Sequence, residues 1–455
     1  MGREVEFAPV GMSEGQAAKR VVDVMGRVRH LVPNAPRDPL VPQDIFTPVG
    51  RIYAELTVLL EIAGPTCISP EALAWTHEAA LSVLRIAESP VADGEQGTFA
   101  HTPSDYGNML HSSASAHSTG CHLSFHSYQP LGEEKLRQFA SMISVLNIVF
   151  GPGGLSFAHG DRLWICCDPR ADHVHQLFGG AAHNQAPKPF FLLRDESWAE
   201  SPAWRLQIAA FGAPRSPVCA WLQAGLLQLA FRQVLMEHTT PCPIDDPITA
   251  LRAAPNQFLW PAGLWRSWRT RPLTKLQAAI KIIKWLSRHG MRQAPNEAAA
   301  ARIESMCSLA IDVANANANP SNGLPTAPSD IAIKTYLLNR VARMNGFADV
   351  SDLGSQCVRY PAADGSMGRA LDAMIVVDAL FNSICDRYST YEMAAREGVF
   401  VKPEFERPVD ITDLSRLPGG VARRDRARAA LLTAQTTGER ICHCDWTELA
   451  MENGR

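Results

Sequence analysis

The chain has 455 residues, a formal net charge of −3, and 46% hydrophobic and 20% charged residues. This composition is that of an ordinary globular protein, long enough for one large domain and a smaller one. The nearly balanced charge excludes a general attraction to nucleic acid or to membrane surfaces. Because no apolar run approaches the roughly 20 residues of a membrane span and no signal peptide pattern is present, we expect no membrane partner.

The eleven cysteines are scattered and form no paired CxxC framework. Such usage favours free thiols in a reducing compartment, so we predict a cytoplasmic protein. Cys442, His443 and Cys444 are possible zinc donors, but three neighbours in a strand cannot all face one ion. Buried thiols are therefore the favoured interpretation of this run.

Short strand-like runs alternate along the chain with longer amphipathic helical patterns. Strands are predicted over residues 2–7, 50–55, 120–128, 162–167, 189–193 and 205–211. Helices are predicted over residues 15–30, 70–88, 133–149, 218–236, 273–288 and 297–315. A loop or linker is predicted over 314–328, a basic helix over 421–433, and a strand with a short helix over 441–451. This alternation, without a glycine-rich phosphate loop, favours an α+β fold.

Acidic residues recur on the first two predicted strands. Alternate side chains of an extended strand share a face, so Glu4 and Glu6 point the same way. If the two strands lie close together, a larger set converges: Glu4, Glu6, Glu55, Glu61, Tyr53 and Arg51. Crowded carboxylates raise one another's pKa unless cations lie between them, and hard oxygen ligands suit Mg²⁺ with phosphate oxygens. The first hypothesis is an ATP–Mg²⁺ site; solvent-facing acids on edge strands are the alternative.

Several short motifs occur in a fixed order. Residues 1–7 match the pattern M-G-x-E-x-E-[YF]. Residues 48–67 match N-G-A-R-L-Y-x-D and H-P-E-Y-A-T-P-E-C at Gly50, Arg51, Tyr53, Glu61, Ala63, Pro65 and Cys67. Residues 118–125 match S-Y-G-C-H-E-N-Y at Ser118, Gly120, Cys121 and His122, and weaker matches follow at 169–173, 193–200, 205–208 and 245–252. This order resembles the Pup ligase and Pup deamidase/depupylase family of carboxylate–amine ligases, and the short interval between the first two motifs resembles the ligase branch.

The resemblance implies a fold and a division into domains. It implies an α+β, glutamine-synthetase-like catalytic domain over residues 1–395, in which helices pack on a curved antiparallel sheet. A small C-terminal domain would follow over residues 396–455.

The resemblance also implies site residues. Glu55 would be the catalytic base, at a position where the family has Asp. Mg²⁺ would be held by Glu4, Tyr53 and Glu61, with Glu6 beside them. ATP would be contacted by Arg51, Gly64, His122, Arg194 and Trp446. From the residues alone, His122 as a hydrogen-bonded strand histidine, Arg194 as a surface ion pair and Trp446 as a core residue remain alternatives.

Some positions depart from the family pattern. Leu123 stands where the family has Glu, and Gln207 stands where it has His. Residues 211–217, which include Pro214 and Pro217, replace the run G-D-S-N-M-S-E.

The implied activity is ATP- and Mg²⁺-dependent formation of an isopeptide bond. It would join a glutamate of a small Pup-like modifier or acidic peptide to an amine of an acceptor protein. The alternatives are a deamidase or isopeptide hydrolase, a small-molecule γ-glutamyl ligase, and a catalytically impaired homologue that binds a modifier or partner as a regulator.

Overall fold

The computed structural model describes most of the chain. The described residues are 1–31, 45–47, 50–55, 58–65, 67, 69–88, 97–102, 119–127, 130–156, 163–179, 188–193, 204–242, 244–259, 272–319, 324–325, 327–356, 365–402, 441–444 and 449–451. Arg194, Trp446 and the basic helix predicted over 421–433 lie outside these residues. The side chains of 441–451 are not described, so the zinc alternative there stays open.

The described strands form one large open sheet, in the order β2-β3-β4-β1-β6-β11-β10-β9, with β5 also paired to β1. These strands are β1 (Gly2–Val10), β2 (Ile45–Thr47), β3 (Gly50–Glu55), β4 (Leu59–Ala63), β5 (Thr98–Ala100), β6 (Cys121–Ser127), β9 (Val174–Gly179), β10 (Lys188–Leu192) and β11 (Trp204–Phe211). Within this sheet the strand pairs are antiparallel except for the parallel pair β9–β10. Three two-stranded ladders lie apart: β7 (Gly154–Ser156) with β8 (Trp164–Cys166), β12 (Phe258–Leu259) with β13 (Leu273–Thr274), and β14 (Ile441–Cys444) with β15 (Leu449–Met451).

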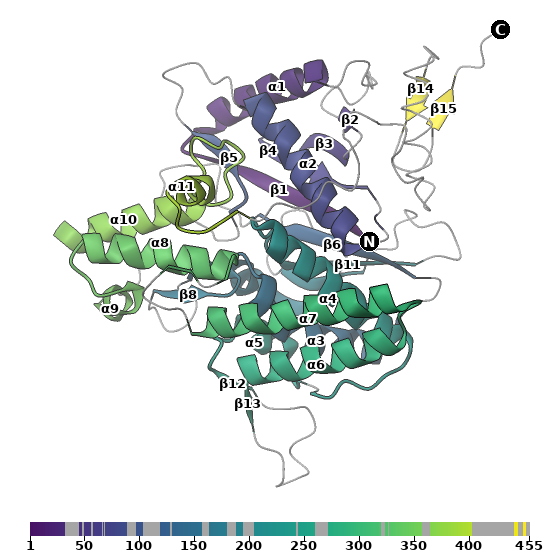
Figure 1. Cartoon of the computed structure of the whole chain (residues 1–455). Coiled ribbons are helices and arrows are strands. Elements are labelled where there is room, and N and C mark those ends of the chain that lie inside the picture. Colours follow the sequence, from purple (N-terminus) through teal and green to yellow (C-terminus); the bar gives the residue numbers. More distant parts are fainter. Residues whose placement is uncertain are drawn as a thin grey trace.

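The helices of the described part pack around the sheet (Figure 1). They are α1 (Glu14–Leu31), α2 (Pro70–Glu88), α3 (Glu133–Phe150), α4 (Pro217–Leu235), α5 (Pro247–Arg252), α6 (Lys275–Arg292), α7 (Glu297–Ala318), α8 (Asp330–Met344), α9 (Val350–Gln356), α10 (Gly365–Ala379) and α11 (Thr390–Arg396), with a short 3₁₀ turn at Pro169–His173. Local signals start several of them, such as the capping box of Thr274 and Gln277 at α6. The protein is therefore a mixed α+β fold, as predicted.

The two faces of the sheet differ in character because side chains alternate along each strand. On β1, Val5 and Phe7 point into a buried cluster that also contains residues of α1 and α2. On β6 and β11, Leu123 and Ile208 point into a second cluster built largely from α3 and α4. The helices thus cover the apolar face, and the alternate residues of the same strands carry the acids on the other face.

Three sequence predictions need correction. Helix α7 continues to Ala318 where a loop was predicted from residue 314, because Asn317 is buried and donates to the carbonyl of Ile148 at 2.7 Å. Residues 449–451 form a strand that pairs with β14 instead of a short helix. No apolar run long enough for a membrane span was expected, but α4 is long and apolar enough by length and composition, and 78% of its apolar stretch is buried inside the protein.

Candidate active site

The pairing of four strands brings the predicted acidic residues together. Strand β4, which the sequence patterns did not reveal as a strand, lies between β1 and β3. In this register Glu61 is opposite Glu6 on one side and opposite Tyr53 on the other. On the far side of β1, Glu4 is opposite His122 of β6. Directly paired residues share a face of the sheet, so the convergence predicted from the sequence follows from the register.

Three of these side chains lie close enough to share one cation. One ligand atom each of Glu4, Glu61 and His122 lies within 4.8 Å of the others. His122 bridges two acids, with Nδ1 at 3.7 Å from Glu4 Oε2 and Nε2 at 3.9 Å from Glu6 Oε1. Since a cation bound at one point can contact all three, this part of the face is a candidate metal site.

The electrostatics of Glu61 fit a bound cation. Burial raises the pKa of the Glu61 carboxyl well above its usual range, and the charges of Glu6, Glu4 and Glu55 raise it further. Burial and the neighbouring Glu61 and Glu4 also raise the pKa of the Tyr53 phenol. A divalent cation would offset this repulsion, and carboxylate and phenol oxygens are ligands that Mg²⁺ accepts. The residues present therefore fit a Mg²⁺ ion.

Glu6 has a different environment from Glu61. Its Oε2 accepts a hydrogen bond from the backbone N–H of Gly120 at 2.6 Å. Burial alone would raise the pKa of Glu6, but His122, Arg170 and the Gly120 N–H together lower it. Gly120 leaves room for this arrangement, because a Cβ there would lie 2.8 Å from His122 Nε2 and 2.9 Å from an Arg170 nitrogen. Glu6 is thus held as an anion beside the candidate metal ligands.

The remaining predicted residues within the described part lie around this centre. The Arg51 guanidinium lies 4.6 Å from the centre of the Tyr53 ring. Glu55, at the end of β3, is close enough to Glu61 for its charge to affect that carboxyl. Gly64 follows β4, and its N–H donates to the carbonyl of Arg3 at 2.8 Å. With no side chain, Gly64 can offer a ligand only backbone groups.

Sequence reasoning missed three polar residues on the same face. Arg205 and Gln207 of β11 both hydrogen-bond Glu4, at 3.1 and 2.8 Å. Lys188, at the start of β10, is half-buried; burial and Arg170 lower its pKa, and the charges of Glu6 and Glu55 raise it. Arg205 and Gln207 lie in the motif at 205–208, which could have indicated that they belong to the site. Only the strand order shows that their side chains reach Glu4.

Of the positions that depart from the family pattern, Gln207 hydrogen-bonds Glu4, whereas Leu123, Pro214 and Pro217 lie away from the acids. Leu123 is fully buried in the core on the helix-covered face. Pro214 lies in the turn between β11 and α4, and Pro217 is the first residue of α4. In this turn Asp330 accepts hydrogen bonds from the backbone N–H groups of Arg215 and Ser216 at 2.5 and 2.8 Å. The replacements at these last three positions therefore affect packing around the site more directly than they affect its ligands.

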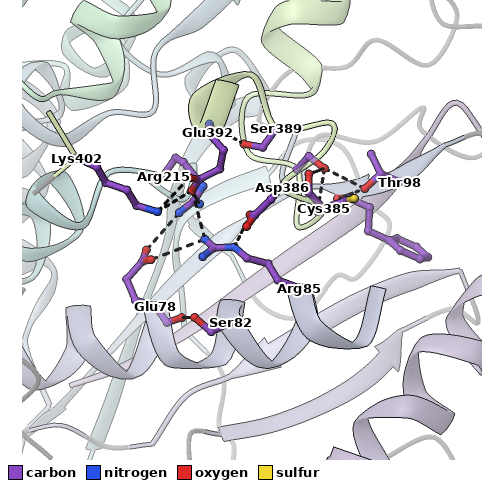
Figure 2. A network of polar contacts seen from close by, with 12 residues as sticks. Glu78, Ser82, Arg85, Thr98, Arg215, Cys385, Asp386, Ser389, Glu392 and Lys402 are labelled. Carbon is purple, nitrogen blue, oxygen red and sulfur yellow. Dashed lines mark hydrogen bonds and ion pairs between the residues drawn. The ribbon is translucent and has the colours of Figure 1, made fainter. Parts of the chain in front are cut away.

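Arg215 of this turn is the centre of a buried ion network (Figure 2). Its guanidinium contacts Glu78 of α2 at 3.4 Å and Glu392 of α11. Lys402 also contacts Glu392, at 2.9 Å, and Arg85 contacts Asp386 at 3.2 Å. Three cations thus face three anions here, which is a balanced arrangement.

Two solved structures resemble this chain along most of its length. One is the crystal structure of the complex between the prokaryotic ubiquitin-like protein Pup and its ligase PafA. It has 16% sequence identity, a TM-score of 0.69, and covers 98% of this chain and 85% of that chain. The other is the Pup ligase PafA in complex with ADP, with 16% identity, a TM-score of 0.62, and coverage of 89% and 83%. No family profile and no curated protein sequence matches the chain. At this identity the likeness shows the fold: the chain has the fold of the Pup ligase, as its ordered motifs predict.

Proposed function

We propose that this chain is an ATP- and Mg²⁺-dependent carboxylate–amine ligase that joins a glutamate of a Pup-like modifier to an amine of an acceptor protein. The observation that carries the proposal is the convergence of Glu4, Glu61 and Tyr53, with Glu55 beside them, on one face of the sheet in a chain with the fold of the Pup ligase. One of the similar structures contains ADP and the other contains Pup, which supports a nucleotide and a modifier as ligands here.

In the proposed reaction the modifier carboxylate attacks the terminal phosphorus of ATP, so that ADP leaves and an acyl phosphate forms. Glu55 then removes a proton from the incoming amine, which attacks the acyl carbon and displaces inorganic phosphate. Mg²⁺ held by Glu4, Tyr53 and Glu61 would neutralise charge on the phosphates. Arg51 and the backbone at Gly64 would contact the nucleotide, as would Arg194 and Trp446. His122 would contact the nucleotide from within the candidate metal site, where it also lies within reach of the cation.

The proposal also includes a division into two domains and a cellular location. A glutamine-synthetase-like core over residues 1–395 would carry the reaction, and a C-terminal domain over 396–455 would bring Trp446 to the nucleotide. The residues that follow position 395 still contact the preceding part of the chain. Val399 and Phe400 pack with Phe381 and Tyr391 in one buried cluster. A cytoplasmic location would supply the ATP.

The proposal is tested with the purified chain, ATP, Mg²⁺ and Pup as the modifier probe. Phosphate release and conjugates detected by mass spectrometry report turnover. Glu55→Gln removes the base, so we expect turnover to fall by about 10²-fold or more while ADP binding is retained. Glu133→Gln, which breaks only an exposed ion pair with Arg137, serves as the control. Turnover by Glu55→Gln equal to that of the wild type would contradict the proposal.

A second candidate is a regulator that binds a modifier without turnover. The observation that favours it is Glu55 itself, whose side chain is one methylene longer than the aspartate of the family pattern. Misplacement of a reacting group by about 1 Å can cost 10²-fold in rate. If the wild type binds Pup and ATP without turnover and Glu55→Asp gains turnover, the regulator is favoured over the ligase.

A further inference from the structure

Strand β1 changes its pairing partner beside the acids of the candidate site. Its pairing with β6 ends at Val5, and its pairing with β5 begins at Ala8. Glu6 lies in the interval between the two pairings. Its backbone N–H still donates to the carbonyl of Gly120 at 3.1 Å, which continues the register with β6 by one residue.

The second hydrogen bond of this pair is replaced. Two residues that form a hydrogen-bonded pair in a regular antiparallel sheet exchange both N–H···O bonds, so the Gly120 N–H would donate to the Glu6 carbonyl. It donates instead to the Glu6 side chain, at 2.6 Å from Oε2. The Glu6 carbonyl is bonded by His101, whose Nδ1 lies 2.9 Å from it. His101 thus takes the place that the Gly120 N–H would have in a regular ladder.

The partners of His101 fix which of its ring nitrogens carries the proton. A carbonyl oxygen only accepts, so Nδ1 must carry a hydrogen to bond Glu6. A backbone N–H only donates, so Nε2, which lies 2.6 Å from the Ala213 nitrogen, must be bare. The Thr119 hydroxyl donates to the Thr102 carbonyl at 2.9 Å, so it accepts from Nδ1 at 3.2 Å. The His101 side chain is 1% exposed, and both of its nitrogens have partners within the protein.

This exchange of partners orients the Glu6 carboxylate. Because Oε2 is held by the Gly120 N–H, Oε1 is the oxygen that faces His122, at 3.9 Å from its Nε2. If the Glu6 carbonyl lost the His101 donor, it would compete for the Gly120 N–H, since a polar group shielded from water is costly without a hydrogen bond. The carboxylate would then lose the short bond that keeps it in place.

We propose that His101 is a positioning residue for Glu6. By bonding the Glu6 carbonyl, His101 directs the Gly120 N–H to the Glu6 carboxylate, which is thereby held beside the candidate metal ligands. The inference rests on the proposed function, because it assumes that a divalent cation binds next to Glu6. It adds a residue outside the sequence motifs, and it connects the acids through the imidazole to the turn at Ala213.

Two substitutions separate the two hydrogen bonds of the imidazole. The amide nitrogen of asparagine can replace Nδ1, so His101→Asn keeps a donor for Glu6 and loses the acceptor for Ala213. The amide oxygen of glutamine, one methylene further out, can replace Nε2, so His101→Gln keeps the acceptor and loses the donor. Since each variant loses one buried hydrogen bond, the two should lose similar stability. Only His101→Gln should affect Glu6.

The amide proton of Gly120 reports the bond to Glu6 directly in nuclear magnetic resonance. With isotope-labelled glycine, a short bond to a carboxylate places this proton far downfield, and Gly120→Ala identifies the signal by its loss. We expect the signal to stay downfield in His101→Asn and to move upfield in His101→Gln.

Mn²⁺ affinity without nucleotide, followed by electron paramagnetic resonance, is the second measurement. Loss of a hydrogen bond behind a metal ligand typically costs about 10- to 100-fold in metal affinity. We therefore expect Mn²⁺ affinity to fall by about tenfold in His101→Gln and to stay near the wild-type value in His101→Asn.

Glu6→Gln tests the same bond with His101 intact, should a variant of His101 fail to fold. An uncharged amide oxygen is a weaker acceptor than a carboxylate, so the Gly120 signal should move upfield. A Gly120 signal that stays in place in Glu6→Gln would overturn the inference.

Equal effects of His101→Asn and His101→Gln on the Gly120 signal would overturn the inference, even if the wild type conjugates Pup, because they would show a purely structural role. Unchanged Mn²⁺ affinity in His101→Gln would overturn it as well. The expected difference in a chain without ATP-dependent turnover would support the inference and contradict the proposed ligase. Absence of Mn²⁺ binding by the wild type would overturn the inference, and conjugation would then decide the proposed function separately.

Discussion

Two groups of charged residues in this protein differ in how their charge is compensated. The ion network around Arg215 pairs each buried acid with a cation, and the pKa of Glu392 is lowered: burial alone would raise it, but Arg215 and Lys402 outweigh burial. On the face of the sheet that carries the acids, burial raises the pKa of Glu61, and the neighbouring carboxylates of Glu6, Glu4 and Glu55 raise it further.

This difference separates a structural role from a functional one. A balanced buried network contributes to the fold, and removal of one partner leaves a buried charge that is costly. A crowded set of acids weakens the folded state unless something outside the chain compensates it. We therefore propose that the carboxylate face, formed by Glu4, Glu6, Glu55 and Glu61, binds a cation, and that the network around Arg215 supports the turn between β11 and α4.

The largest expected effect is on the balanced network. Arg215→Met removes the most buried cation of the network and leaves Glu78 and Glu392 with only the longer contacts of Arg85 and the contact of Lys402, so we expect a loss of about 3 kcal/mol in the free energy of unfolding. Urea unfolding measures it. The exposed pair of Arg340 and Glu397 is the control, because Arg340→Ala should cost less than about 1 kcal/mol. If Arg215→Met and Arg340→Ala lose the same free energy of unfolding, the network around Arg215 stabilises the fold no more than an exposed ion pair does.

The pH dependence of stability should have opposite signs at the two sites. Stability from Glu392, whose pKa is lowered, is present above the ordinary glutamate pKa and is lost as pH falls through the lowered value. Glu61, whose pKa is raised, has the opposite effect, so stability is lost as pH rises above about 4.5 through the raised value. Without metal at pH 7, we expect Glu392→Gln to be less stable by about 2 kcal/mol and Glu61→Gln to be more stable by about 1 kcal/mol.

Denaturant unfolding at several pH values, with EDTA present, measures these differences. Both should shrink as the pH is lowered toward 4 and below. If Glu61→Gln is less stable than the wild type at pH 7 without metal, Glu61 is not under the repulsion described.

A smaller effect is expected at Gly120. An added Cβ would lie within 3.0 Å of His122 and Arg170, so Gly120→Ala must displace one of them. We expect the affinity for Mn²⁺ to fall by roughly threefold, because small shifts of a ligand are costly. Gly132→Ala is the control, since a Cβ there meets nothing within 4 Å. If Gly120→Ala binds Mn²⁺ with the same affinity as the wild type, His122 is not part of the metal site.

Local patterns in the sequence predicted much of this fold. The alternation of Glu4, Glu6, Tyr53 and Glu55 placed the acids on one face. Helical spacing placed α1, α2, α3, α4, α6 and α7 within a few residues, whereas α5 and α8 to α11 were not predicted. The apolar run of Leu59–Ala63 was not recognised as a strand, because Glu61 is a buried acid within it and apolar alternation is absent. The end of α7 was misplaced because buried contacts of Asn317 outweigh the local preference of its alternating Asn and Ala residues.

The contacts that complete the candidate site depend on strand order. Glu4 and Gln207 are 203 positions apart in the chain, and no local pattern joins them. Gln207 is a departure from a motif in the sequence, but in the fold it is a hydrogen-bond donor to Glu4. The effect of a replaced motif residue can therefore be interpreted only when the hydrogen-bond or packing partner of its side chain in the fold is known.

We propose above all that the carboxylate face binds ATP together with a divalent cation. Calorimetric titration of ATP into the wild type and Glu61→Gln, each with Mg²⁺ and with EDTA, tests it most directly. We predict that Mg²⁺ tightens ATP binding to the wild type by about tenfold or more, and that Glu61→Gln loses this dependence. Equal ATP affinity with and without Mg²⁺ in the wild type, or full Mg²⁺ dependence in Glu61→Gln, would contradict the account.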